Sequence, residues 1–373
     1  MMPNMDSARV YALNVHARYA CRHSGACCTA GWSIPVEPAK QALLGAEWLT
    51  PSSDGACPQL DRDAHRCRVH RDHGEAALPE SCRHFPRRSL LDPRGTFVSL
   101  SHFCPTAASL LVETDGPLSI VDGPAAFPQD RVYDGLDARH GWPPLLRPDV
   151  LFDYESFSMW ERFLVAALGS SAGDVSSTLT RIAGIAERLR AWSVEHGPLR
   201  AWTVAALASQ IDGMRGRTQS LVTVGLQDSL EQQYRALLGP EAFVSVCATV
   251  PEALTHPTVP DHLDEADAAW VAPHWSDHAG LVRRFLASKA FASWTPYQSR
   301  GIRTHVAELF VAAGVLRIEC ARICANQSVA LSQETLLDAI RMTDWLLVHL
   351  ADRERLMAWL GRIETNVQVF ADA

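Results

Sequence analysis

The pattern of apolar positions changes character near residue 150. Beyond it, apolar residues recur at three- and four-residue steps, as in "AELFVAAGVLRIECARICA" (307–325) and "LLDAIRMTDWLLVHLAD" (336–352). This spacing places them along one face of an α-helix. The pattern predicts helices over the following ranges: 154–169, 174–196, 199–214, 227–239, 276–294, 299–326 and 332–351. Since no strand pattern intervenes, residues 151–373 are predicted to form an all-α helical domain.

Shorter elements are predicted in the first 113 residues. Residues 9–20 alternate apolar and polar positions, which suits a short strand, and residues 96–104 suit a second strand. Residues 35–49 suit a short helix with proline near its start. Residues 51–95 are rich in Pro, Gly, Asp, His and Arg and have few apolar side chains. Burial can hardly order such a stretch, so a cross-link is expected to order it.

These patterns together predict an α+β fold that is mainly α. A small, irregular, cysteine-rich module with short strands occupies residues 1–113, and an irregular Pro/Gly-rich linker follows over 114–150. The all-α domain covers 151–373, and a chain of 373 residues is long enough for this division.

Charge and hydropathy narrow the partners and the compartment. The net charge is −8, and it divides into +2 over residues 1–105 (12 Lys and Arg, 10 Asp and Glu) and −10 over the remainder (22 against 32). This balance argues against a nucleic-acid partner. The longest apolar runs contain charged residues and are too short for a membrane span. The N-terminus lacks the basic start and apolar core of a secretory signal, so the expected location is cytoplasmic.

Cysteine is the informative residue. Seven of the ten cysteines lie in the first 104 residues: Cys21, Cys27, Cys28, Cys57, Cys67, Cys82 and Cys104. In a reducing compartment such a cluster binds metal more often than it forms disulfides, and an odd number cannot pair completely. These seven are therefore the predicted metal ligands. The alternative is that they pack as small apolar residues.

The spacing leaves the metal and the ligand set open. Thiolates bind Zn²⁺ in tetrahedral sets of four and also hold iron–sulfur clusters. Ser24 interrupts the regular spacing of Cys21, Cys27 and Cys28. His70 stands three residues after Cys67, and His102, on the predicted strand, would share a face with Cys104. Ser24, His70 and His102 are the residues that could complete the coordination. Cys247, Cys320 and Cys324 are expected to pack in the helical core.

Several short segments carry a family resemblance: "YAC" (19–21), "CPQL" (57–60), "CRVH" (67–70) and "CRHFP" (82–86). They resemble the YkgJ-type cysteine-cluster family, described as zinc- or iron-chelating domains with a CxxCxxCC signature. "CCTAGW" (27–32) and the helical second half further resemble flagellin lysine N-methylases. The resemblance implies an iron–sulfur cluster, with [4Fe–4S] placed slightly before zinc, and S-adenosylmethionine as a cofactor. Two residues depart from the family pattern: Ser24 replaces a signature cysteine, and His70 replaces an aromatic residue.

Two classes of function follow as expectations. The first is a cytoplasmic metal-cluster protein whose helical domain binds a protein partner or substrate; its enzymatic form would methylate lysine. The alternative is a non-catalytic metal chaperone, sensor or scaffold with a structural zinc. No C-x3-C-x2-C, G-x-G-x-x-G after a predicted strand, or G-x-S-x-G motif is present. The sequence therefore names no catalytic or cofactor-binding residue.

Overall fold

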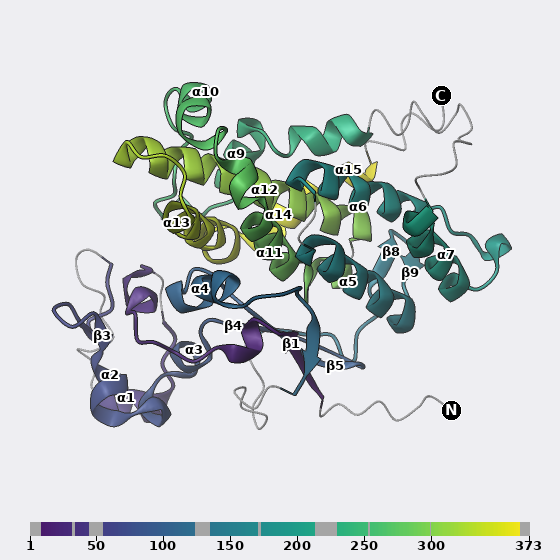
Figure 1. Ribbon diagram of the computed structural model, residues 1–373. Helices are drawn as coiled ribbons and strands as arrows, with labels where there is room; N and C mark the ends of the chain where they lie inside the picture. Colours follow the sequence, from purple (N-terminus) through teal and green to yellow (C-terminus); the bar gives the residue numbers. More distant parts are fainter. Residues whose placement is uncertain are drawn as a thin grey trace.

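The structure, a computed structural model, describes residues 9–31, 34–44, 55–123, 135–170, 173–212, 230–252, 254–298 and 300–365. The fold is α+β and mainly α, as predicted. A layer of helices covers a smaller sheet, and the loops that carry the cysteines extend from the sheet at one end (Figure 1).

The sheet has five strands in the order β6-β1-β5-β4-β7. Its strands are β1 (Val10–Leu13), β4 (Arg87–Asp92), β5 (Gly95–Leu100), β6 (Ile120–Asp122) and β7 (Gly135–Asp137). The hairpin β4–β5 is antiparallel, with Arg87 opposite Leu100, whereas β1 runs parallel to β5. The predicted strand over 9–20 ends at Leu13, because the 3₁₀ turn η1 (His16–Arg18) follows. The predicted strand over 96–104 ends at Leu100.

The segment 114–150, predicted to be an irregular linker, contributes strands to the fold. Its first strand, β6, pairs antiparallel with β1, and β7 pairs parallel with β4, so the two together form the edges of the sheet. The segment ends in a separate two-stranded ribbon of β8 (Leu145–Arg147) and β9 (Val150–Leu151). Strands of two or three residues show no alternation long enough to detect in the sequence, because long-range pairing forms them.

The helical region follows the predicted pattern closely. Its longer helices are α5 (Tyr154–Gly169), α6 (Val175–Arg190), α7 (Leu199–Asp212), α9 (Pro240–Cys247), α11 (Ala279–Ala290), α12 (Ile302–Gln327), α13 (Gln333–Asp344) and α14 (Arg353–Leu360). Shorter elements are η5 (Val194–His196), α10 (Leu263–Ala266), η6 (Asp267–Val271), η7 (Trp275–His278), η8 (Thr295–Tyr297), η9 (Trp345–Leu350) and α15 (Arg362–Thr365). The side chains of Asp153 and Asp174 cap α5 and α6 by accepting main-chain N–H groups.

Sequence reasoning missed α9 and α14, which have eight residues each. Of the predicted helix ends, 45–49, 213–214 and 227–229 lie outside the described residues.

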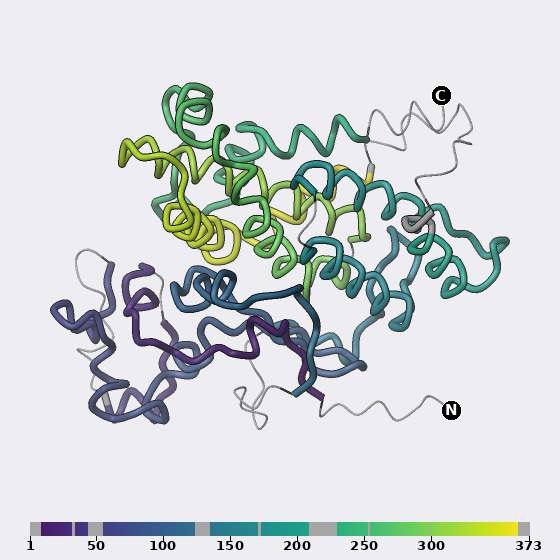
Figure 2. The backbone as a smooth tube through the Cα atoms, in the orientation of Figure 1, coloured from purple at the N-terminus to yellow at the C-terminus, as the bar shows by residue number. Residues whose placement is uncertain are grey.

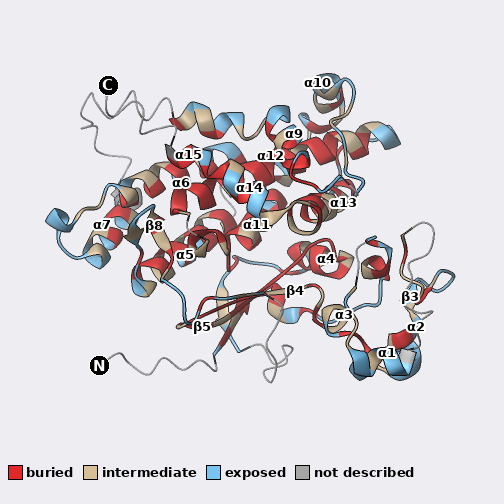
Figure 3. Cartoon of the chain, turned by 180° about the vertical axis from the view of Figure 1, so that it is seen from behind, coloured by how far each residue is buried: buried red, intermediate tan, exposed pale blue. Residues whose placement is uncertain are grey.

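One apolar core joins the sheet to the helices. Leu13, Leu90 and Phe97 on the strands belong to the same buried cluster as Trp160 of α5 and Phe285 of α11. Helix α12 is buried along most of its length (Figure 3). Each fully buried large apolar side chain stabilises the fold by about 1.5–3 kcal/mol. The division at residues 113 and 151 stays a prediction, but the two parts share this core.

Buried charges also cross the junction. Arg94, between β4 and β5, donates to Asp92 on its own hairpin (2.7 Å) and to Glu161 of α5 (3.1 Å). Asp344 at the end of α13 accepts from Lys289 of α11 (2.7 Å) and from the main-chain N–H of His102 (2.6 Å). Within the described part of the chain, no helix is both long enough and apolar enough to cross a membrane.

Candidate metal centre

Four cysteines from three chain segments share one small packed cluster. Cys27, Cys57 and Cys67 pack against its buried residues, which include Cys28, and these three cysteines are the groups that shift the pKa of the Cys28 thiol most. Cys27 and Cys28 lie on the 3₁₀ turn η2 (Ala26–Thr29), while Cys67 ends strand β3 of the hairpin β2 (Leu60–Asp61)–β3 (Arg66–Cys67). We call Cys27, Cys28, Cys57 and Cys67 the thiol cluster. The backbone loops that carry it gather at one end of the molecule (Figure 2).

Main-chain hydrogen bonds hold these segments together. The N–H of Cys57 donates to the carbonyl of Cys28 (2.7 Å), which fixes the loop before the hairpin against η2. Arg68 N–H donates to the carbonyl of Gln59 (2.9 Å) and closes the hairpin. Trp345 Nε1, in η9, donates to the carbonyl of Ala30 (3.4 Å). The cysteine loop is therefore tied both to the hairpin and to the helical region.

Gly25 allows this close approach. Its φ is +69°, a left-handed conformation that side chains disfavour, and a Cβ there would lie 2.7 Å from the carbonyl oxygen of His65. Its carbonyl accepts the N–H of Cys28 at 2.9 Å, which sets the turn that presents Cys27 and Cys28. Sequence reasoning missed Gly25, although a glycine between Ser24 and Ala26 in a cysteine loop was a readable signal.

The surroundings favour thiolates at three of the four positions. A hydrogen bond from Cys28, followed by main-chain N–H donors including that of His70, lowers the pKa of Cys67 to about 6. Cys28 and the N–H of Gln59 likewise lower the pKa of Cys57 to about 7, against the opposing effect of burial. The pKa of Cys27 is also lowered, chiefly by Cys28. Because the thiolate is the metal-binding form, the lowered pKa values of all three favour a bound cation, and those of Cys57 and Cys67 lie near neutral pH.

Cys28 and Cys82 differ from them. The pKa of Cys28 is raised strongly, first by its interaction with the sulfurs of Cys27, Cys57 and Cys67, any one of which can accept its single S–H proton, and then by burial. Cys82, on α3 (Glu80–His84), has its pKa raised to about 12 by burial and by the charges of Cys27, Cys57 and Cys67. A cation among these sulfurs would reverse both shifts, since it stabilises thiolates. Cys82 is thus an electrostatic neighbour of the thiol cluster, and both Cys82 and Cys67 pack against the buried residues Val69, Ala77 and Leu78.

The remaining two of the seven cysteines lie elsewhere, around Tyr19. The Tyr19 hydroxyl is 3.8 Å from Cys104 Sγ. Cys104 precedes α4 (Pro105–Glu113) and accepts N–H groups of Thr106 and Ala107, and its pKa is raised, mainly by burial. Cys21 is exposed and acts electrostatically on both Cys104 and Tyr19. The structure therefore divides the seven cysteines into the thiol cluster with Cys82 and the pair Cys21 and Cys104.

Three residues were considered for completing the coordination. Of these, His70 and His102 make other contacts, and Ser24 is exposed. The His70 ring packs against that of His23, with centroids 4.4 Å apart, and only its main-chain N–H serves Cys67. His102 is fully buried at the sheet–helix junction, where its Nε2 lies 3.2 Å from His16 Nε2. The expectation that His102 shares a strand face with Cys104 is wrong, because β5 ends at Leu100. Ser24 is exposed.

Across the described ranges, no group of three or more His, Cys, Asp or Glu side chains is already arranged to hold a metal ion. The donor chemistry nevertheless fits one. Four thiolates at about 2.3 Å from one ion make a tetrahedral zinc site, and all four sulfurs belong to the same packed cluster. Loss of the thiol protons and a movement of the side chains toward one another would create the site.

The other cysteines pack as expected. Cys320 and Cys324 are fully buried on α12, and Cys247 is buried with its thiol donating to the carbonyl of Pro257 (3.3 Å). Comparisons with known proteins add nothing to this geometry: no family model, no curated sequence and no solved structure matches the chain. The resemblance to the YkgJ-type family therefore stays a prediction from the sequence.

Proposed function

We propose that this chain is a metal-binding protein whose ion is held by the thiol cluster of Cys27, Cys28, Cys57 and Cys67. The observation that supports it most is the packing of Cys28 with Cys27, its neighbour on η2, and with Cys57 and Cys67 from two other segments. Partly buried thiols seldom gather in this way in a cytoplasmic protein unless they bind metal. The lowered pKa values of Cys57 and Cys67 supply the required thiolates.

The compact arrangement favours a single tetrahedral ion, and zinc is the first choice. The ligands of a [4Fe–4S] cluster each bind a different iron, so their sulfurs spread around the whole cluster. Four sulfurs that pack in one small cluster suit one ion better. A [4Fe–4S] cluster, placed first on the sequence resemblance, becomes the alternative; Cys82 would be its nearest additional ligand.

The metal's role follows from the packing around it. The hairpin and its flanks bury few apolar side chains in the part that the structure describes: Cys28, Ala56 and Leu60 form the buried part of their cluster there. Such a small cluster stabilises its loops weakly, so a bound ion would supply much of their order. We therefore propose that the protein is a scaffold. Its metal ion would be structural and would order a surface that binds a protein partner. A cytoplasmic location, where thiols stay reduced, accords with this role.

Lysine methylation with S-adenosylmethionine stays a prediction from the resemblance. A thermal-shift titration with S-adenosylmethionine tests it, because a ligand of the folded state raises the melting temperature. Unchanged melting at millimolar cofactor would count against an enzyme of that kind.

Metal content of variants tests the proposal itself. The purified protein should contain one zinc per chain, without iron, acid-labile sulfide or visible colour. Cys28→Ser and Cys67→Ser should each weaken zinc binding by more than about 100-fold, beyond the 10–100-fold typical for residues that only support ligands. Cys21→Ser is the matched control, since Cys21 lies in the same module, is exposed, and stands apart from the thiol cluster. This control should retain its zinc.

Two results would contradict the proposal in different ways. Full metal content in Cys28→Ser would remove Cys28 from the ligand set and with it the central contact. Stoichiometric iron and sulfide in the anaerobically purified protein would replace the single ion by an iron–sulfur cluster.

A further inference from the structure

The turn η2, which carries two of the four clustered cysteines, is fixed at both of its ends. At its start, Gly25 lies against the carbonyl of His65 on the neighbouring hairpin. At its end, Ala30 is buried, and its carbonyl accepts the Nε1–H of Trp345 in η9 (3.4 Å). Within the described residues, this is the one hydrogen bond that joins residues 26–30 to the helical region.

The element that donates this bond has an unusual backbone. η9 is a π-helix, and the N–H of Ala351 at its end donates to the carbonyl of Leu346, five residues back (2.9 Å). Such turns are rare, and they occur frequently where a function depends on the local shape of a helix. The contacts of η9 therefore need an explanation beyond the packing of a regular helix.

Buried contacts hold η9 against the sheet. Asp344, the residue before it, binds Lys289 Nζ (2.7 Å) and the N–H of His102 (2.6 Å). Within η9, His349 Nε2 lies 2.7 Å from Ser101 Oγ. Ser101 and His102 directly follow β5, so these contacts attach η9 to the end of the sheet from which the cysteine loops extend (Figure 1).

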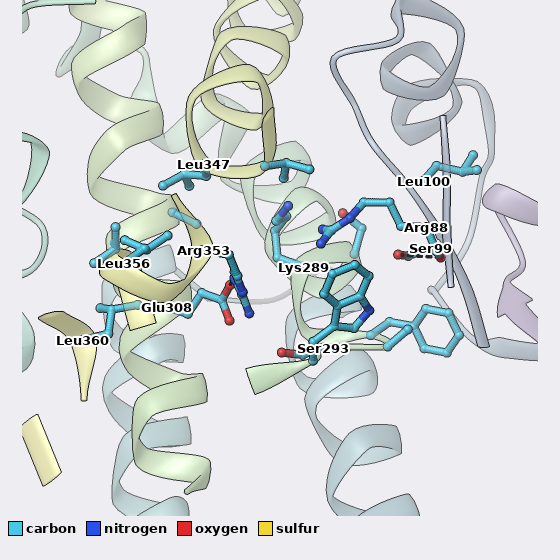
Figure 4. A pocket seen from close by; sticks show the side chains of 17 residues that line it. Arg88, Ser99, Leu100, Lys289, Ser293, Glu308, Leu347, Arg353, Leu356 and Leu360 are labelled. Carbon is cyan, nitrogen blue, oxygen red and sulfur yellow. Dashed lines mark hydrogen bonds and ion pairs between the residues drawn. The ribbon is translucent and has the colours of Figure 1, made fainter. Parts of the chain in front are cut away.

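A cavity lies on another side of η9. Leu347 and Val348 of η9 line it together with Leu100 of β5 and Lys289 of α11 (Figure 4). Its volume is ≈ 30 Å³, whereas one water molecule requires roughly 10–15 Å³. Because protein interiors are otherwise closely packed, this space leaves η9 room to shift and gives its hydrogen bonds more weight in fixing its position.

We propose that Trp345 is a positioning residue for the metal centre: it holds the end of η2 so that Cys27 and Cys28 face Cys57 and Cys67. This inference rests on the proposed function, because it concerns the same thiol cluster. Groups behind the ligands set their orientation and, through it, the metal affinity.

The same bond couples the metal centre to the sheet–helix junction. The four sulfurs have to move toward one another to bind one ion, and η2, a turn of four residues, carries its end with it. Zinc binding therefore changes the contact between the Ala30 carbonyl and Trp345. By linkage, whatever fixes Trp345 in η9 also favours the bound ion.

The zinc affinity of two tryptophan variants of the full chain, measured by competition with a chelator, tests the proposal. Trp345→Phe keeps an aromatic ring but removes the N–H donor. It should weaken zinc binding about three- to tenfold, the effect of one neutral hydrogen bond.

Trp202→Phe is the matched control. Trp202 Nε1 also donates to a main-chain carbonyl, that of Arg188 (3.0 Å), but α7 lies at the opposite end of the molecule from the cysteine loops (Figure 1). This variant should bind zinc as the unaltered chain does. Circular dichroism of both variants establishes that each is folded before it is titrated.

A spectroscopic measurement separates positioning from a general loss of stability. In the unaltered chain with ¹⁵N-labelled tryptophan, the indole N–H resonance of Trp345 is the one that is missing from the spectrum of Trp345→Phe. It should move as zinc is added, because the Ala30 carbonyl moves with η2. The indole resonance of Trp202 should stay in place.

Two kinds of failure can be told apart. Equal zinc affinities of Trp345→Phe and Trp202→Phe, or a Trp345 resonance that zinc does not move, would overturn this inference and leave the thiol cluster as the metal site. A chain that binds no zinc would overturn the proposed function, and this inference with it.

Discussion

At the junction between sheet and helices, the fully buried carboxylate of Asp344 joins three groups. It accepts from Lys289 Nζ and from the N–H of His102, and its Oδ2 lies 3.4 Å from His102 Nδ1. Burial alone would raise the pKa of Asp344, yet Lys289 and His102 hold it well below its usual range. Removal of this charge leaves Lys289 facing a buried neutral group, which is the costly way to break a buried pair.

Asp344→Asn should therefore lower the free energy of unfolding by about 3–5 kcal/mol, as measured by urea denaturation at pH 7. Asp338→Asn, on the same helix α13, is the control. Asp338 is 45% exposed in its side chain and pairs with Arg341 three residues on, so its loss should cost less than about 1 kcal/mol. Equal effects of the two substitutions would show that Asp344 carries no special role at the junction.

At the scale of elements, periodicity was a good guide to helices and a poor guide to the sheet. The predicted range 154–169 matches α5 at both ends, because Asp153 caps a helix whose apolar stripe is continuous. Alternation located β1 and β5, although both end earlier than the ranges 9–20 and 96–104 that it predicted. It missed β4 and the three-residue strands β6 and β7, because strands formed by pairing with distant segments leave little local pattern in the sequence.

In the candidate site, too, local sequence patterns could not reveal contacts between distant segments. Cysteine density predicted metal-binding chemistry within the first 104 residues, but the division of the seven cysteines into two groups depends on tertiary structure. His102 illustrates why: two residues from Cys104 in sequence, it turns into the junction because Asp344 and His16 bind it there. Spacing along the chain could not reveal partners that lie on α13 and η1.

Gly25→Ala tests how the cysteine loop is built. A left-handed conformation costs a side-chain-bearing residue about 1–2 kcal/mol, and the new Cβ would also meet His65 O at 2.7 Å. The displaced η2 should weaken zinc affinity at least tenfold, as measured by competition with a chelator. Gly74→Ala is the control, since Gly74 also has a positive φ, of +79°, but no atom within 4 Å of the new Cβ. If Gly25→Ala leaves the zinc affinity unchanged, metal binding does not depend on the conformation of the cysteine loop.

At the scale of the whole molecule, the shared core encloses several histidines. His16, His305 and His349 all have a lowered pKa, mainly because burial disfavours the charged ring; the values for His305 and His349 are about 4 and about 3. In the unfolded chain each would take up a proton near pH 6.5. The unfolded state then binds more protons than the folded state, so the stability that these histidines provide is complete above pH 6.5 and falls as the pH drops toward their folded pKa values.

One pH unit below 6.5, each histidine should reduce the free energy of unfolding by about 1.4 kcal/mol, or about 4 kcal/mol for the three. Urea denaturation at pH 7.5 and pH 5.5 measures this difference. His349→Gln should remove about one third of it while the chain remains folded. If the free energy of unfolding is the same at these two pH values, the buried histidines take up protons in the folded chain as they do in the unfolded chain, which would contradict the lowered pKa values.

The most direct test of the proposed metal centre is X-ray absorption at the zinc edge of the purified, intact chain. An ion held by Cys27, Cys28, Cys57 and Cys67 gives a first shell of four sulfurs at about 2.3 Å. A first shell dominated by nitrogen or oxygen at about 2.0–2.1 Å, or a protein that is fully folded and contains no metal, would contradict the thiol cluster as the site.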